Sequence, residues 1–134
     1  MLKRMFFPFL ITIVFLIIFR CFVSNPETAV KKYFKEYGYE LCEKPVEITD
    51  YTFPSFMSPV LYEYEKIQQK TGLSVKPYLG KTVKRYTYEL KNVPLFKGQR
   101  IRANALVYKN KVICSDIMTV GINGFMIAPN ENLP

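Results

Sequence analysis

The sequence of 134 residues contains no histidine and no tryptophan, and it contains only three cysteines. The absence of histidine excludes His-based catalytic triads and zinc sites with imidazole ligands. The glycines occur singly, so no Gly-rich phosphate-binding loop is present, and no Cys-x-x-Cys pair indicates a metal site. We therefore expect no metal, no cofactor and no catalytic residue of these kinds.

A long hydrophobic run occupies the N-terminus. Lys3 and Arg4 precede Met5–Val23, which is the pattern of an export signal. As a helix, this run is about 28 Å long at about 1.5 Å per residue, enough to span the hydrocarbon core of a membrane. The run is therefore predicted to cross a membrane once.

The end of this run does not favour cleavage. The positions before Ser24 do not offer the small residues that signal peptidase requires. Arg20 stands where lipidation of Cys21 would require a small residue. We therefore predict an uncleaved anchor at residues 1–24, a single domain at 25–128 and a short tail at 129–134.

The charges on the two flanks of this anchor favour opposite orientations in the membrane. Lys3 and Arg4 favour a cytoplasmic N-terminus, whereas Arg20, Lys31, Lys32 and Lys35 lie on the other flank and oppose it. Because these three lysines fall in a predicted helix of the folded domain, they count for less. We expect a single-pass protein of the cell membrane with its domain on the extracytoplasmic side.

The domain is predicted to be α+β, in the order helix, strand, helix, strand, strand, strand. Apolar residues at helical spacing predict helices over Pro26–Tyr37 and from Pro59 to a stop at Gly72. Alternation and β-branched residues predict four strands: Glu43–Tyr51, Thr82–Leu90, Arg100–Lys109 and Val112–Val120. A tight hairpin is predicted at Asn110 and Lys111. We expect both helices to pack on one face of an antiparallel sheet of about four strands.

Charge is unevenly distributed along the domain. Residues 25–75 hold six basic and eight acidic residues, whereas residues 76–111 hold ten basic residues and one acid, Glu89. A clustered basic half would attract anionic lipid or wall polymer. Bases spaced through strands are also typical of a solvated sheet face. Tyr86 and Tyr88 beside Lys84 are not accompanied by an RNA-recognition motif, so no nucleic-acid partner is expected.

Asp116 is the most distinctive single residue, because it lies inside the apolar strand predicted at 112–120. The carboxylate is either exposed or buried with a partner, as a structural ion pair or as a ligand-binding group. The candidate partners are Arg85, Arg100 and Arg102. By strand alternation Asp116 shares a face with Cys114 and Met118.

Two further features leave alternatives open. The loop at 91–99 is a candidate contact surface if its apolar side chains, Phe96 among them, are exposed, or it folds back on the core. Outside the cell, Cys42 and Cys114 could form a disulfide. The alternative for these cysteines is that both are small buried hydrophobic residues.

Several spaced segments together resemble a known family. They are Tyr62-Glu63-Tyr64, Pro77-Tyr78, Gly80-Lys81, Arg85-Tyr86-Thr87-Tyr88-Glu89, Arg102-Ala103-Asn104, Leu106-Val107-Tyr108, Asp116 and Gly124-Phe125-Met126. Over about residues 48–126 the chain resembles a family of domains of unknown function. Its members are short membrane-anchored or exported proteins of Gram-positive, often endospore-forming, bacteria. The family has glycines directly before the aspartate, where this chain has Cys114 and Ser115. The resemblance implies placement and fold, but no reaction or ligand.

Three functions follow as hypotheses. The first, which we favour, is a non-enzymatic domain at the outer membrane surface that binds a protein or envelope partner. The second is a basic domain that binds anionic polymer or lipid through residues 76–111. The third is a wall-active enzyme that uses Asp116 or glutamates. A glycosidase of that kind requires two facing carboxylates roughly 5–10 Å apart.

Overall fold

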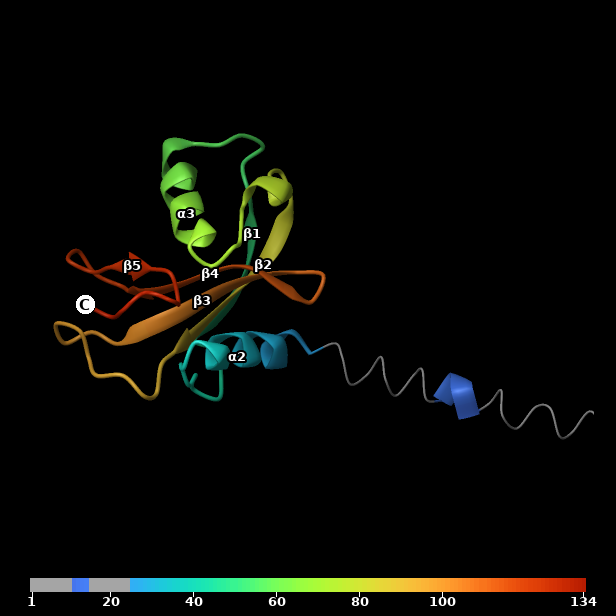
Figure 1. The fold of residues 1–134 in the computed structure, drawn as a ribbon, viewed down its shortest axis with the longest axis horizontal. Coiled ribbons are helices and arrows are strands. Elements are labelled where there is room, and N and C mark those ends of the chain that lie inside the picture. Colours follow the sequence, from blue (N-terminus) through green and yellow to red (C-terminus); the bar gives the residue numbers. More distant parts are fainter. Residues whose placement is uncertain (1–10, 15–24) are drawn as a thin grey trace, which may run out of the picture.

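The computed structural model of the chain describes residues 11–14 and 25–134 (Figure 1). Most of the anchor predicted at residues 1–24 lies outside the described residues. Within the described ranges, no helix is both long enough and apolar enough to span a bilayer.

The described chain forms an α+β domain, as predicted. The elements are α2 (Pro26–Glu36), β1 (Glu47–Thr52), α3 (Pro59–Gln69), the 3-10 turn η1 (Lys76–Tyr78), β2 (Thr82–Glu89), β3 (Ile101–Tyr108), β4 (Lys111–Thr119) and β5 (Met126–Ile127). The strands form one antiparallel sheet in the order β1-β2-β3-β4-β5 (Figure 1). The fifth strand was not predicted, because two residues are too few to show alternation.

Local sequence signals explain where the helices begin and end. The side chain of Asn25 accepts a first-turn N–H of α2 at 3.0 Å, and the Ser58 hydroxyl accepts one of α3 at 3.2 Å. A proline follows each cap. Beyond the helices, Gly38 and Gly72 adopt φ values of 85° and 76°, in the left-handed region that glycine tolerates best.

The hairpin between β3 and β4 is present, but its centre differs from the prediction by one residue. The two turn residues are Lys109 and Asn110, with φ values of 49° and 61°, and Tyr108 pairs with Lys111. Two successive positive φ values are typical of a type I′ turn, whose twist matches that of the strands. The predicted centre at Asn110 and Lys111 is wrong because Lys109 adopts a conformation usually found at Asn or Gly.

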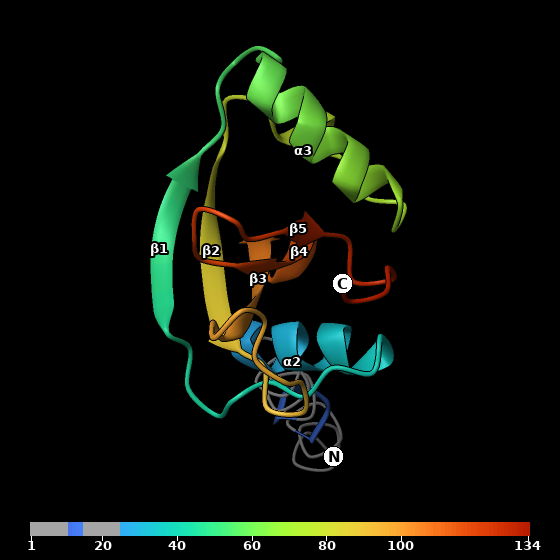
Figure 2. The same ribbon diagram turned by 90° about the vertical axis from the view of Figure 1, so that its left-hand side faces the viewer.

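The two helices lie on opposite faces of the sheet (Figure 2), so the prediction of one shared face is wrong. Phe34 of α2 packs in a core with Ala105, whereas Leu61 of α3 packs in a second core with Leu106. Ala105 and Leu106 are consecutive on β3 and therefore point to opposite faces. Because the sheet is apolar on both faces, each face requires its own helical cover.

The backbone of β4 at Ser115 connects both helices to the sheet. The fully buried amide of Gln68 donates to the Ser115 carbonyl at 2.9 Å and accepts from the Ser115 N–H at 2.8 Å. The Gln68 amide thus supplies hydrogen bonds to the edge of β4 at Ser115, because β5 pairs only with Ile117 and Met118. On the other face, the Ser115 hydroxyl bonds to the Tyr33 hydroxyl at 2.7 Å. Tyr64 lies one turn before Gln68 in α3, so the same contact positions it over the sheet.

The segment predicted as a tail, residues 129–134, is attached to the end of α3. Asn130 donates its amide to the Lys70 carbonyl at 2.7 Å, and Lys70 donates to the Glu131 carboxylate at 2.6 Å. Glu131 also accepts the Ala128 N–H at 2.7 Å. The C-terminal end of α3 is therefore held at a defined place above the sheet.

Candidate functional site

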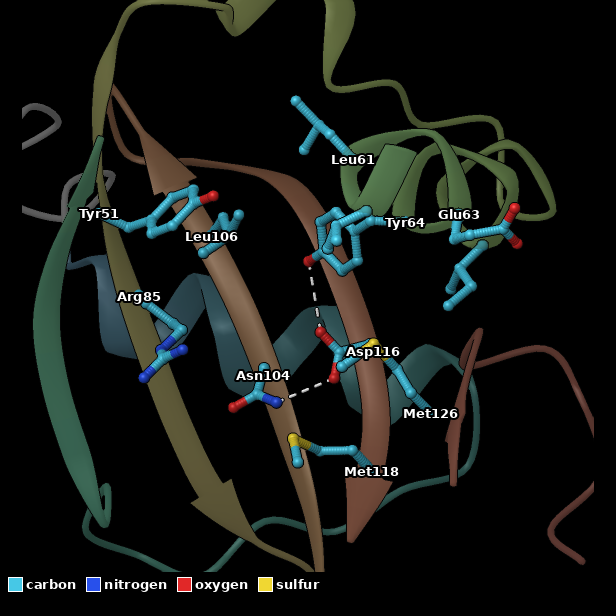
Figure 3. A pocket seen from close by; sticks show the side chains of 12 residues that line it. Tyr51, Leu61, Glu63, Tyr64, Arg85, Asn104, Leu106, Asp116, Met118 and Met126 are labelled. Carbon is cyan, nitrogen blue, oxygen red and sulfur yellow. Dashed lines mark hydrogen bonds between the residues drawn. The ribbon is translucent and has the colours of Figure 1, made fainter. Parts of the chain in front are cut away.

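A pocket of about 460 Å³ opens between α3 and the sheet (Figure 3). Its wall is mostly apolar or aromatic and is formed by Tyr51, Val60, Leu61, Ile67, Leu106, Met118 and Met126. Its polar lining consists of Glu63, Tyr64, Arg85, Asn104 and Asp116. This size, with an apolar wall and few polar groups, is typical of sites that bind small ligands.

Asp116 lies on the pocket floor at the end of a row of hydrogen bonds and is only 3% exposed. The Tyr64 hydroxyl donates to its Oδ1 at 3.3 Å, and the Asn104 amide donates to its Oδ2 at 2.8 Å (Figure 3). The Thr87 hydroxyl donates in turn to Asn104 Oδ1 at 2.7 Å. Thr87, Asn104 and Asp116 are direct neighbours across β2, β3 and β4. The carboxylate is the final acceptor of this row.

Burial determines the protonation of these groups. It raises the pKa of Asp116 to about 6, although the hydrogen bonds from Asn104 and Tyr64 and the charge of Arg85 act in the opposite direction. Burial also raises the pKa of Tyr64 well above its usual value, so this hydroxyl remains a donor. Asp116 thus titrates close to neutral pH, and a charge bound nearby can change its protonation.

Arg85 projects from β2 beside Asn104 (Figure 3). Its Nη2 lies 3.7 Å from the Glu47 carboxylate on β1, which is longer than a hydrogen bond. Its Nε is buried and has no hydrogen-bond partner, and its side chain makes no hydrogen bond to any described residue. Arg85 therefore enters the pocket with unused donors.

The ion-pair alternative for Asp116 is not the one observed, because Asp116 forms no ion pair with any described residue. Hydrogen bonds from neutral side chains take its place. Arg100 pairs instead with Glu89 at 3.6 Å and is largely exposed. Arg102 lies opposite Glu89 and does not line the pocket. Of the predicted partners of Asp116, only Arg85 shares its pocket.

Phe96 lies away from the pocket, because the loop at 91–99 folds back on the core below the α2 face. The Phe96 ring packs edge-on against Phe125 with centroids 5.0 Å apart. Leu95 is the large side chain of this loop that stays mostly exposed, at 59%. Of the two alternatives for this loop, a contact surface or a segment packed on the core, Phe96 follows the second.

Cys42 and Cys114 are both free thiols, and the disulfide alternative does not fit the structure. The Cys42 N–H donates to the Glu89 carbonyl, on the side of β2 that faces β1. Cys114 lies in β4, where it pairs with Leu106 of β3. With strands about 4.8 Å apart, these positions are separated by well over the roughly 7 Å that a disulfide spans between Cα atoms. Burial raises the pKa of Cys114 to about 12, which keeps this thiol protonated.

Sequence analysis did not single out Tyr64 or Asn104 as site residues. Tyr64 lies within the helix predicted from Pro59 by its apolar spacing, and its hydroxyl gives no signal of its own. Counting back from the observed turn at Lys109 and Asn110 would place Asn104 opposite Ser115. A β-bulge in β4 moves the register by one residue and places Asn104 opposite Asp116 instead. The shared face of Asp116, Cys114 and Met118 was predicted correctly.

An antiparallel sheet with one helix on each face and a pocket under the second helix defines a small α+β domain. Residues 33–117, more than half of the chain, match the family model described as Domain of unknown function (DUF4830), and the chain belongs to this family. The match runs from the last turn of α2 to Ile117 in β4 and includes Tyr64, Arg85, Asn104 and Asp116. Comparison with curated proteins and with solved structures gave no match. The predicted membership in a family of unknown function is confirmed.

Proposed function

We propose that this chain is a non-enzymatic domain, anchored at the outer face of a bacterial membrane, that binds its partner molecule in the pocket between α3 and the sheet. The observation that carries the proposal is this pocket of about 460 Å³, whose apolar wall surrounds Asp116, Asn104 and Arg85. The anchor is the run Met5–Val23, and α2 begins directly after it at Pro26. The proposal includes a Gram-positive bacterial source, which the sequence resemblance implies.

The polar groups of the pocket are arranged to bind rather than to cleave. Both oxygens of Asp116 already accept hydrogen bonds. The other carboxylate of the pocket, Glu63, points away from Asp116 (Figure 3) and pairs with Lys66 at 2.7 Å. A glycosidase requires two carboxylates that face a common space. The arrangement therefore favours a binding domain over a wall-active enzyme.

The fold also mixes the charges that are separate in the sequence. Among the described residues, the basic segment pairs with acids outside it at Lys84–Asp50 (3.7 Å), Arg85–Glu47 (3.7 Å) and Lys91–Glu40 (3.8 Å), and within it at Arg100–Glu89 (3.6 Å). The first two arise because the basic β2 lies directly beside the acidic β1. Such a mixed surface weakens the hypothesis of a basic domain that attracts anionic polymer.

Pocket binding is tested with 8-anilinonaphthalene-1-sulfonate, which fluoresces in apolar sites. We expect saturable binding by the full chain. Met118→Trp, which fills the pocket, should weaken binding by about tenfold or more, since it removes most of the apolar space. Leu95→Trp adds the same side chain at an exposed place outside the pocket and should leave the affinity unchanged. Equal affinities for Met118→Trp and the unmodified chain, with equal thermal melts, would refute the pocket as the binding site.

The location of the domain is tested separately. A tag is added after Pro134, and protease is added to intact protoplasts. We expect the tag to be lost without lysis, because the domain is proposed to lie outside. A tag that survives until the cells are lysed would overturn the proposed orientation.

A further inference from the structure

We infer that the molecule bound in the pocket is a small carboxylate with an apolar body, and that the guanidinium of Arg85 holds its carboxylate. This inference rests on the proposed function, since it names the chemical class of the ligand for the same pocket.

The unused donors of Arg85 carry the inference. The Nε atom of Arg85 is buried and has no acceptor. The nearest carboxylate to the guanidinium belongs to Glu47 and lies 3.7 Å from Nη2. A guanidinium presents its N–H groups as a planar fork, which matches the two oxygens of one carboxylate. The Arg85 side chain is 42% exposed, so it can turn outward to present its Nε edge. A ligand carboxylate at this edge supplies the missing acceptor.

The remaining wall determines the body of the ligand. Leu106, Ile67, Met118 and Met126 line the pocket with apolar surface. The two methionines can adapt to bodies of different shape, because the thioether side chain is flexible and polarisable. The volume of about 460 Å³ equals that of about 15 water molecules at about 30 Å³ each, which suits a ligand of about a dozen non-hydrogen atoms.

The other charges around the pocket argue against a cationic ligand. Asp116 is 3% exposed, and both of its oxygens already accept hydrogen bonds. Glu63 is paired with Lys66 and directed away from the pocket floor. Glu47 lies beyond Arg85 on β1. An ammonium group would therefore meet the cation of Arg85 before it reached a free carboxylate.

The test measures binding of matched water-soluble probes to the full chain by calorimetry. The probes are 4-phenylbutanoate, octanoate, the neutral isostere 4-phenylbutanamide and the cation 4-phenylbutylamine. We expect at least one acid to bind with a Kd about tenfold or more below that of the amide, because only an acid forms the charged fork with Arg85. The amine should bind most weakly. The acid that binds more tightly shows whether the body is aliphatic or aromatic.

Two arginine variants assign the carboxylate to its partner. Arg85→Met keeps the length of the side chain and removes its donors, so the Kd of the acids should rise by about tenfold while that of the amide stays the same. Arg100→Met is the matched control, because Arg100, directly before β3, is also paired with a glutamate but lies outside the pocket. If Arg85→Met does not fold, Arg85→Lys keeps the charge and loses the fork, and it should still weaken acid binding.

The outcomes separate this inference from the proposed function. Equal Kd values for acid and amide, unchanged in the Arg85 variants, would overturn the carboxylate while leaving the pocket as a binding site. Perturbation of the labelled methyl groups of Met118 and Met126 by any probe supports binding in the pocket. If no probe binds or perturbs these methyl groups, both the inference and the proposed pocket fail.

Discussion

Replacing Asp116 with asparagine removes a buried titratable group and keeps its shape. In the folded chain, burial raises the pKa of Asp116 from 3.8 to about 6. The folded state therefore binds more protons than the unfolded state between these values, and stability falls as the pH rises through this window. A difference of about two pKa units corresponds to about 3 kcal/mol. Asp116 thus lowers the free energy of unfolding at neutral pH by up to about that amount.

An asparagine at this position keeps both hydrogen-bond partners. Its carbonyl accepts from the Asn104 amide, and its own amide donates to the Tyr64 hydroxyl, since a hydroxyl both donates and accepts. We therefore expect Asp116→Asn to raise the free energy of unfolding at about pH 7.5 by about 1–3 kcal/mol. Near pH 4 the aspartic acid is neutral as well, so the two proteins should be almost equally stable.

Urea unfolding followed by circular dichroism at several pH values measures both effects. Asp50→Asn is the control, because Asp50 is an exposed aspartate on β1; it should not raise the free energy of unfolding at about pH 7.5 as Asp116→Asn does. The reasoning is refuted if Asp116→Asn has the same pH dependence as the unmodified chain, or if it is clearly less stable at about pH 7.5. A confirmed gain would show that the chain retains a residue at a cost in stability, which is typical of functional sites.

The remaining predictions concern the packing of α3, the ligand and the hairpin. Gln68→Ala leaves the buried backbone groups of Ser115 without partners and should cost about 2–4 kcal/mol in urea unfolding; a loss below about 0.5 kcal/mol would contradict the role of Gln68 at the β4 edge. The affinity for 4-phenylbutanoate should rise as the pH falls from about 7.5 to about 5.5, because protonation of Asp116 removes a negative charge near Arg85. Calorimetry of Asp116→Asn should show an affinity that does not change with pH. If the affinity of this variant changes with pH as much as that of the unmodified chain, Asp116 is not the cause. Lys109→Gly removes the strain of a left-handed backbone at φ 49° and should stabilise the chain by about 0.5–1 kcal/mol, measured as a higher Tm. A lower Tm would show that the lysine side chain stabilises the fold by more than its backbone conformation destabilises it.

The sequence by itself determined most of the secondary structure and part of the site. Caps such as Asn25 and Ser58, and stop signals such as Gly38 and Gly72, act within a few residues of themselves, so a single chain shows them. The alternation of β4 also placed Asp116 with Met118 on one face, because alternation is local too. The α+β class followed from these elements.

Only the tertiary structure decided which face each helix covers and what meets Asp116. The bulge in β4, opposite the step from Leu106 to Val107, moves the β3–β4 register by one residue, and such a shift exchanges the faces of the β4 side chains beyond it. It places Asp116 opposite Asn104, and α3 brings Tyr64 to the same carboxylate from another part of the chain. These contacts depend on pairing and packing between distant segments, and no local pattern in the sequence records them.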